Sequence, residues 1–232
     1  IRGPVRPNFF RAATNNDVEN KYGYRYGKWL TASLYAKCEF VGVSKGDCSC
    51  KVEYAYDLPN LQDEKVHLVY EVYGDGKIIV DMSYQPVVSE IEMPVFGLIF
   101  QLYKDMEEVN YYGFGPEENY IDRNKGALLG KYTYQVTDNL TPYLYPQECG
   151  NRTHVRELSV AGENTKLKIK GEDFEFSALH YTPYELENAR HKDELPNVYQ
   201  TVLCINEKQM GIAGDDTWGA KTHDEFLLDK EK

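Results

Sequence analysis

The stretch VHLVYEVYGDGKIIVDMSY, residues Val66–Tyr84, decides the fold class. Apolar side chains occupy every second position on both sides of the central GDG, Gly74–Gly76. The alternating residues are Val66, Leu68, Tyr70, Val72, Ile78, Val80, Met82 and Tyr84. A period of two on either side of a glycine-rich turn is typical of a β-hairpin with one buried face. We therefore predict a hairpin that turns at Gly74–Gly76.

Further strand patterns surround this hairpin. Residues 48–56 alternate in the same way, whereas 93–103 and 201–205 are apolar nearly throughout and predict strands that are buried on both faces. In residues 166–178 two alternating runs flank Gly171-Glu172-Asp173, which predicts a second hairpin with its turn at Gly171–Asp173.

Only one segment carries a good helix signal. Thr182-Pro183-Tyr184-Glu185 offers a Thr N-cap, Pro at the first helical position and Glu at the third, which predicts a short helix ending before Pro196. Many short strands with almost no helix indicate an all-β protein, either a sandwich or a barrel.

The chain of 232 residues suits one large β domain. Residues 1–8, which begin without Met, are expected to be a linker from a preceding domain, as in a piece of a longer polypeptide, and 9–232 a single domain. Residues 225–228 begin another strand-like pattern that stops in the charged residues 229–232. We therefore expect the domain to be cut within or just before its last strand.

Charge and composition limit the classes of partner that this chain can bind. The net charge of −11 and a pI near 5.0 argue against nucleic acid, whose phosphates require Lys and Arg. The sequence contains no apolar run of about 18 residues, so we expect no membrane span. Twenty tyrosines stand out. Their ordinary role is sheet packing, and the alternative is stacking on sugars.

The five cysteines lack the spacing of a metal site. Cys48 and Cys50 are two residues apart on one predicted strand face, where they cannot easily bridge. We expect all five to be ordinary buried thiols, which leaves the cellular compartment open. They are Cys38, Cys48, Cys50, Cys149 and Cys204.

Four segments do not read as strand or turn filler. They are NFFRAATNND (8–17), YGFGPEENYIDR (112–123), TPYLYPQECGNR (141–152) and MGIAGDDTW (210–218). In this order they resemble the C-terminal, small-chain or fifth domain of family 2 β-galactosidases. Phe10 replaces the usual Trp, Ala13 replaces Pro, and Thr217 replaces Ser. These exchanges nearly preserve side-chain class or size, so the resemblance holds.

The resemblance implies a large antiparallel β-supersandwich like that of galactose mutarotase, packed on a (β/α)₈ barrel. In that family the two catalytic glutamates come from the barrel, so no catalytic residue is expected in this chain. No cofactor is expected here either, although parent enzymes of the family can use Mg and Na. The implied partners are a galactoside substrate and the barrel.

The resemblance also assigns candidate site residues. Trp218 matches the tryptophan that forms a platform for the substrate sugar, which suits a flat indole. We expect Trp218 to be at least partly exposed, with the segment 11–17 close by. Arg11, Asn15 and Asp17 are expected to support the site loop or to act only as a hydrogen-bonded scaffold. Asp215 and Asp216 could bind sugar hydroxyls or a cation, but after Gly214 their commoner role is a turn.

Other carboxylates and histidines lead to weaker hypotheses. Glu117, Glu118 and Asp122 invite an acid/base pair, but the family places no catalytic residue there, and Asp122 beside Arg123 suggests an ion pair. An alternative function is a free-standing aldose 1-epimerase, for which the candidates are His154, His180 and Glu118. A third is a carbohydrate-binding module. The five histidines are scattered without the spacing of a zinc site.

Overall fold

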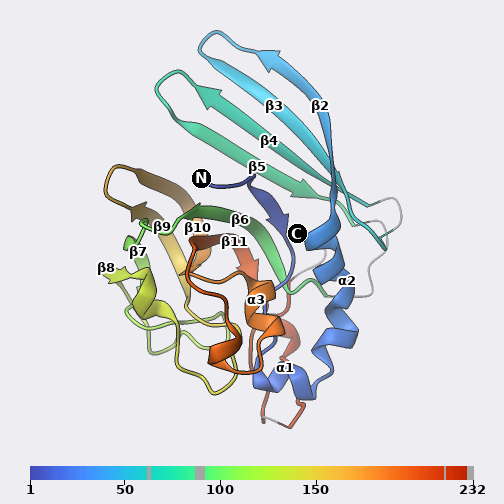
Figure 1. Cartoon of the computed structure of the whole chain (residues 1–232). Helices are drawn as coiled ribbons and strands as arrows, with labels where there is room; N and C mark the ends of the chain where they lie inside the picture. Colours follow the sequence, from blue (N-terminus) through green and yellow to red (C-terminus); the bar gives the residue numbers. More distant parts are fainter. Residues whose placement is uncertain (62–63, 87–91, 217, 229–232) are drawn as a thin grey trace.

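The computed structural model describes residues 1–61, 64–86, 92–216 and 218–228, which form two antiparallel sheets with helices at their side (Figure 1). The larger sheet forms the body of the molecule, and the smaller one projects from it. This arrangement confirms the prediction of an all-β sandwich with antiparallel sheets.

The seven-stranded sheet has the order β1-β6-β11-β10-β9-β7-β8, and each neighbouring pair is antiparallel. Its strands are β1 (Arg6–Asn8), β6 (Val95–Tyr103), β7 (Glu108–Gly115), β8 (Leu128–Gln135), β9 (Asn151–Ala161), β10 (Lys166–Leu179) and β11 (Gln200–Gln209). The central β6 and β11 are mostly buried, in line with the expectation for their continuous apolar runs. Three of the eight residues expected to form a linker therefore belong to the sheet, as β1.

The four-stranded sheet has the simple order β2-β3-β4-β5. Its strands are β2 (Lys37–Lys45), β3 (Ser49–Asp57), β4 (Lys65–Tyr73) and β5 (Ile78–Tyr84). Between β4 and β5 the Tyr73 N–H bonds to the Lys77 carbonyl, and Gly76 has a φ of +87°, which glycine adopts without strain. The predicted hairpin turn at Gly74–Gly76 is confirmed.

The second predicted turn is wrong. Residues Gly171–Asp173 lie inside the long strand β10, where its register against β9 shifts between Lys170 and Phe174. The strand bends at this irregularity, and its second half also pairs with β11. The real hairpin turn follows β9, where the Gly162 N–H donates to the Thr165 carbonyl.

The helices include two that the sequence reading missed. They are α1 (Asn15–Glu19), α2 (Tyr22–Tyr35) and α3 (Pro183–Asn188), with 3₁₀ turns η1 (Val136–Asn139), η2 (Lys192–Glu194) and η3 (Asp224–Phe226). The predicted helix at Pro183 is confirmed, including the Thr182 capping box. The expectation of a single helix is wrong because α2 begins without a side-chain cap, at Lys21 with a φ of 57°.

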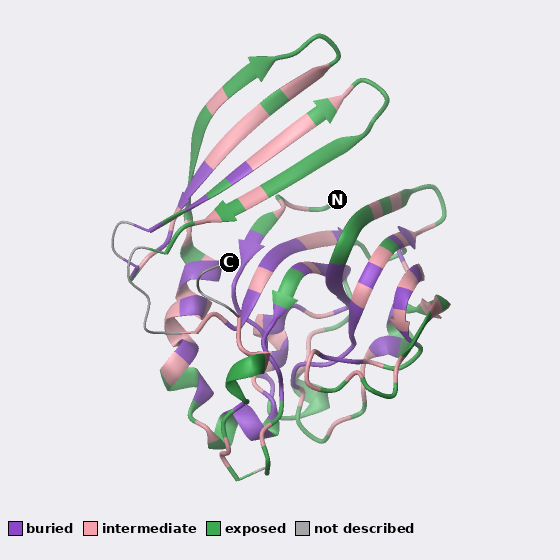
Figure 2. Cartoon of the chain, turned by 180° about the vertical axis from the view of Figure 1, so that it is seen from behind, coloured by how far each residue is buried: buried purple, intermediate pink, exposed green. Residues whose placement is uncertain are grey.

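The two largest of four apolar clusters in the described residues hold the sheets and the helix α2 together. The first joins both sheets and α2: Trp29 and Tyr22 of the helix pack with Leu68 of β4 and Leu98 of β6. The second lies on one face of the seven-stranded sheet and includes Phe176. Figure 2 shows burial concentrated in the body and at the base of the four-stranded sheet, whereas the projecting strand ends are exposed.

Two further expectations need correction. The cysteines are not all buried: Cys38 and Cys48 are exposed and Cys50 is half-buried, while burial raises the pKa of Cys149 and Cys204 to about 12. Residues 225–228 do not begin a strand, because 224–226 form the 3₁₀ turn η3. Residues 229–232 lie outside the described part of the chain. Among the described residues, the helices are all too short or too polar to cross a membrane.

Candidate functional site

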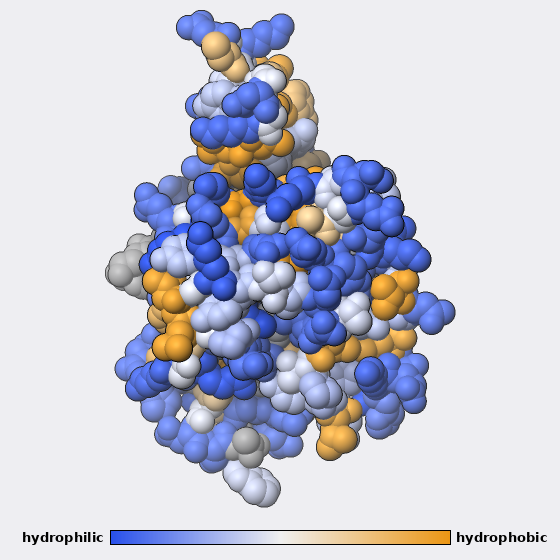
Figure 3. Space-filling view, turned by 90° about the vertical axis from the view of Figure 1, so that its left-hand side faces the viewer, coloured by the Kyte–Doolittle hydropathy of each residue, from blue (hydrophilic) through white to orange (hydrophobic). Residues whose placement is uncertain are grey.

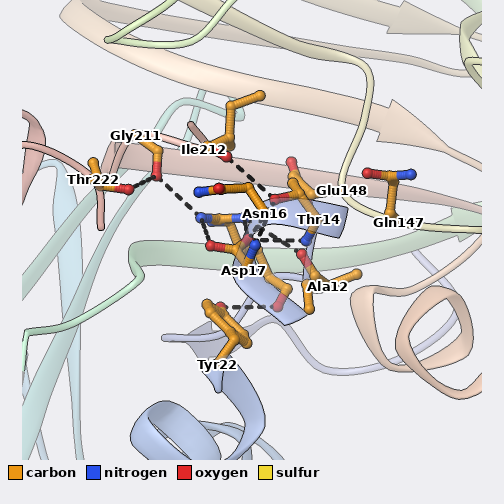
Figure 4. Close-up of polar contacts among 12 residues, drawn as sticks. Ala12, Thr14, Asn16, Asp17, Tyr22, Gln147, Glu148, Gly211, Ile212 and Thr222 are labelled. Atoms are coloured by element: carbon orange, nitrogen blue, oxygen red, sulfur yellow. Dashed lines mark hydrogen bonds and ion pairs between the residues drawn. The ribbon is translucent and has the colours of Figure 1, made fainter. Parts of the chain in front are cut away.

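A buried ion pair forms the base of the candidate site. Arg11 Nη1 lies 2.6 Å from Asp17 Oδ2, and the two side chains are 1% and 4% exposed. Burial opposes the guanidinium charge, but Asp17 together with Tyr22 and Glu148 raises the pKa of Arg11 overall. Arg11 Nη2 also donates to the Gly211 carbonyl at 3.1 Å, so the pair ties residues 8–17 to the segment after β11 (Figure 4).

Helix α1 adds further links between the same two segments. Thr14 caps the helix by accepting from the Asp17 N–H, and Asp17 accepts from the Thr14 N–H. The Asn16 amide donates to the Ala220 carbonyl at 3.2 Å. Asn15 is exposed, and its backbone N–H donates to Gln147 at 3.2 Å. Arg11 and Asp17 are thus part of a buried hydrogen-bonded network, and their support of a site loop remains a prediction.

Asp122 fixes the start of the segment that follows β11. Its Oδ2 accepts from the Ile212 and Ala213 N–H groups, both at 2.8 Å. The expected ion pair between Asp122 and Arg123 is wrong, because Arg123 bonds to Glu118 at 2.6 Å instead. Asp122 therefore acts as an anchor for a backbone turn, a role that the sequence did not suggest.

Residues 214–216 and 218–220 carry the contacts that hold the backbone on either side of Trp218. Asp216 Oδ1 accepts from the Trp218 N–H at 2.8 Å and from the Ala220 N–H at 3.1 Å. A Cβ on Gly214 would lie 2.3 Å from the Ala220 carbonyl oxygen, so only glycine fits where the loop closes. The described contacts of Asp216 are those of a turn residue.

Asp215 has a different neighbour. Its Oδ1 lies 2.8 Å from His223 Nε2, and both side chains are exposed. This carboxylate raises the pKa of His223. The two residues link the loop to the stretch before η3.

Trp218 is 85% exposed, whereas Trp29 of α2 is 1% exposed. The partial exposure expected for Trp218 is thus observed, and the segment 11–17 contacts its loop as expected. The loop lies against the end of α1, at the end of the molecule opposite the four-stranded sheet (Figure 1). The exchange noted at Thr217 lies outside the described residues.

Other exposed apolar side chains gather on the elements beside this loop. Val18 of α1 is 62% exposed, and Tyr24 in the first turn of α2 is 91% exposed. Single exposed apolar residues are common on protein surfaces, whereas contiguous groups of them mark surfaces that meet a partner. Neither residue lies in the four sequence motifs, so the sequence analysis did not single them out.

Glu118 sits at the joint between the second and third motifs. It accepts hydrogen bonds from the Tyr143 hydroxyl at 2.6 Å, the Gly150 N–H at 2.7 Å and the Thr141 hydroxyl at 2.8 Å. Desolvation would raise its pKa, but these donors and Arg123 lower it overall. A carboxylate so fully bonded is suited to holding loops together and not to proton transfer.

Two buried glutamates were missed by the sequence reading. Glu148 and Glu175 are 7% and 6% exposed, and burial raises their pKa values to about 7 and about 8. Gln209 donates to Glu148 at 3.2 Å, and Asn151 donates to Glu175 at 2.9 Å. Glu148 lies beside the Arg11 network (Figure 4), where the guanidinium lowers its pKa against the effect of burial.

The epimerase candidates have separate partners. His180 is buried against Glu107 and the Gln200 carbonyl, whereas His154 is partly exposed and faces Asp173 at 3.2 Å. Within the described ranges, no hydrogen bond joins any two of His154, His180 and Glu118.

A small cavity adjoins the ion pair. It has a volume of about 70 Å³ and is lined by Asp17, Arg25, Glu92 and Lys221, among others. This is far below the ~300 Å³ or more of ordinary ligand pockets. In the described part of the chain, no three His, Cys, Asp or Glu side chains cluster so as to hold a metal ion. That this domain needs no cofactor remains a prediction.

Comparison with known proteins places the chain in a family. All of it, residues 1–232, matches the family described as the β-galactosidase small chain. A β-galactosidase of Streptococcus thermophilus is 40% identical over 98% of this chain, and one of Halalkalibacterium halodurans is 39% identical over 98%. The matches cover only 22% and 23% of those proteins, so the chain spans about a fifth of their length.

A shorter relative has nearly the same extent. The β-galactosidase small subunit of Latilactobacillus sakei is 29% identical over 97% of this chain and 80% of its own length. The match along all residues agrees with the four ordered motifs and with the two antiparallel sheets. This chain belongs to the β-galactosidase small-chain family.

Proposed function

We propose that this chain is a domain of a larger β-galactosidase that hydrolyses terminal β-D-galactosides, and that the domain itself is non-catalytic. The first relatives are β-galactosidases about five times as long, which supports the larger enzyme. Retaining glycosidases use two carboxylates about 5 Å apart. We place both in a (β/α)₈ barrel that this domain supports.

The exposure of Trp218 is the observation that carries the proposal. An indole left in water forgoes roughly 1.5–3 kcal/mol of burial, so a partner or ligand is the natural complement of this side chain. The loop is held at Gly214–Ala220 and at Asp216, which keeps the indole at a defined place. In the whole enzyme, Trp218 would form one wall of the sugar site, with the C–H face of the galactose ring against it.

The neighbouring surface supports the same orientation. Val18 and Tyr24 lie exposed on the elements beside the Trp218 loop. In our proposal these apolar side chains pack on the barrel around the sugar site. Arg11 and Asp17 would then act on the substrate only indirectly, by fixing the backbone that carries Trp218.

The carboxylates of this domain support a non-catalytic role. Glu118 is fully bonded within its own loops, and Glu148 is buried behind the Arg11 network. A general acid or nucleophile must instead reach the glycosidic bond. We therefore expect the purified chain not to hydrolyse a chromogenic β-galactoside, and turnover that survives purification to homogeneity would contradict this.

The decisive experiment is Trp218→Ala in the full-length enzyme. Loss of the platform should weaken galactoside binding by roughly 1–3 kcal/mol, measured with a competitive inhibitor. The midpoint temperature of thermal unfolding should not change. Trp218→Phe should recover part of the loss, because a flat ring remains.

Tyr35→Ala provides a matched control, because Tyr35 is 67% exposed at the far end of α2. It should leave inhibitor binding unchanged. Equal binding by the Trp218→Ala enzyme and the unmodified enzyme would remove Trp218 from the sugar site.

A further inference from the structure

The four-stranded sheet has one apolar face along its whole length. Directly opposed residues of neighbouring strands point to the same side, and each row on this side is almost entirely apolar. The residues of this face are Cys38, Phe40, Val43, Lys45, Cys50, Val52, Tyr54, Tyr56, Val66, Leu68, Tyr70, Val72, Ile78, Val80, Met82 and Tyr84. We call this set the apolar face.

The opposite face of the same sheet is mostly polar, with few apolar residues such as Ile79. Lys65 pairs with Asp57 at 3.0 Å, and Lys51 lies 3.8 Å from Glu71, all on that side. Such surface ion pairs are typical of a face that stays in water. The two faces therefore differ in the way that a half-buried antiparallel sheet requires.

The domain covers only one end of the apolar face. Val66 and Leu68 are fully buried in the first core, next to Trp29. Towards the free end, Val43 is 58% exposed and Ile78 is 55% exposed, and on the edge strand β2 Phe40, in the row of Leu68, is also 58% exposed. The alternation thus continues beyond the point where this domain's own core ends.

The uncovered part is continuous. Its exposed members are Phe40, Val43, Val72, Ile78 and Val80, with Cys50 and Val52 half-buried among them. Figure 3 shows orange side chains along the side of the projecting sheet that faces the body of the molecule. Soluble monomers rarely leave so continuous an apolar surface in water.

We propose that the free end of the apolar face binds an apolar segment of the rest of the β-galactosidase polypeptide, outside these 232 residues. This rests on the proposed function, in which the chain works within a larger enzyme. Two observations favour that occupant. The matched relatives have about four-fifths of their length outside this chain, and the open end is continuous with a core that already joins two sheets.

The occupant would present aliphatic or aromatic side chains and no charge at its centre. The rows that it meets contain Val, Ile and aromatic side chains, with Lys45 only at the outermost position. A charge pressed against this surface would be desolvated without a partner, which is costly. The interface would therefore resemble a domain core, as in permanent associations.

Cys50 provides a direct test because it lies on the uncovered part of the apolar face. In a Cys38→Ser/Cys48→Ser variant, Cys50 is the accessible thiol, since Cys149 and Cys204 are buried with raised pKa values. We expect Cys50 to react with a thiol reagent at least about tenfold more slowly in the full-length enzyme than in the isolated chain. Equal rates would overturn the proposal.

The matched control is Cys38→Ser/Cys50→Ser, which keeps Cys48 at the exposed turn between β2 and β3. Its reaction rate should be the same in both proteins, which shows that the reagent reaches the end of the sheet. The readout needs neither catalysis nor Trp218. The proposal and the proposed sugar site can therefore fail separately.

Ile78 and Ile79 test which face is involved, because they are adjacent residues of β5 with 55% and 42% exposure on opposite faces. Ile78→Asn in the full-length enzyme should restore the reactivity of Cys50, and Ile79→Asn should not. In sedimentation the isolated chain should be a monomer. A dimer that Ile78→Asn dissociates and Ile79→Asn preserves would assign the face to a second copy and overturn the proposal.

Discussion

The Arg11–Asp17 ion pair and the Trp218 loop are neighbours that reverse the usual placement of side chains. The charged side chains of Arg11 and Asp17 are almost completely buried, whereas the large apolar side chain of Trp218 is 85% exposed. The buried charges hold backbone carbonyls and a helix cap in place, so they serve the fold. The exposed indole contributes little to this domain's own core, which is consistent with its proposed role in substrate binding. In this region the degree of exposure of a side chain, and not its polarity, distinguishes the residues that stabilise the fold from the residue proposed to bind substrate.

Breaking the ion pair should give the largest loss of stability. Arg11→Met leaves the buried Asp17 carboxylate without its cation, which costs about 3–5 kcal/mol. Urea unfolding of the isolated chain should show this loss as a lower midpoint. In the double variant Arg11→Met/Asp17→Asn, the Asn side chain can still accept from the Thr14 N–H, and the unpaired carboxylate charge is removed. This variant should therefore recover much of the lost stability. A loss below about 1 kcal/mol in the single variant would mean that the pair is not structural.

Glu148 makes the same buried region sensitive to pH. Burial raises its pKa from 4.5 to about 7. As pH rises above 4.5, the unfolded chain releases this proton first, while the folded chain holds it until about pH 7. The free energy of unfolding should therefore fall with rising pH across this window, by on the order of 2–3 kcal/mol in total.

Glu148→Gln should flatten part of this slope, because the amide cannot ionise. Some slope should remain, since Glu175 has a pKa raised to about 8 for the same reason. Urea midpoints at pH 5, 6, 7 and 8 provide the measurement. An identical pH dependence in Glu148→Gln and the unmodified chain would show that Glu148 ionises normally in the folded state.

Closure of the Trp218 loop should have a smaller effect. A methyl group on Gly214 would meet the Ala220 carbonyl oxygen at 2.3 Å, so Gly214→Ala must shift the loop, at a cost of about 1–3 kcal/mol. Gly27→Ala is the control, because that position in α2 has open space and a helix favours Ala by about 1 kcal/mol. We expect the midpoint of thermal unfolding to fall in Gly214→Ala and to rise in Gly27→Ala. A stabilised Gly214→Ala variant would contradict the close approach seen at the base of the loop.

The strands could be predicted where alternation was strict. Val66–Tyr84 gave both the hairpin and its turn, because period two and a Gly-Asp-Gly turn are local properties. The same logic failed at Gly171–Asp173, since a bulge inside a strand uses the same residue types as a turn. Helix α2 was missed because its two glycines and uncapped start hide a buried stripe of Tyr22, Tyr26 and Trp29.

The candidate site was predictable only in part. The ordered motifs named Arg11, Asp17 and Trp218, and the exposure of Trp218 was expected, but nothing in the sequence indicated that Arg11 and Asp17 would be buried. Asp122 reaches the Ile212 N–H across 90 positions of sequence, and such a contact has no local signature. The exposure of Tyr24 likewise depends on how α1 and α2 meet, which is a property of the packed structure.

The smallest expected effect is that of Trp218→Ala on the isolated chain. Because the indole is 85% exposed, its removal eliminates little buried apolar area, and the change in unfolding free energy should stay within about 0.5 kcal/mol. Trp29→Ala is the matched comparison: the same residue type is 1% exposed and bonds to the Glu92 carbonyl, so its loss should cost about 3–5 kcal/mol. The difference in unfolding free energy between the two variants, measured by urea unfolding, therefore tests whether Trp29 stabilises the fold while Trp218 does not. If Trp218→Ala unfolds the chain, the indole belongs to the core in solution and the sugar-platform assignment fails. If both variants behave as expected, the loop can lose its platform without losing its shape, and any weaker galactoside binding by Trp218→Ala in the full-length enzyme is then attributable to the indole itself.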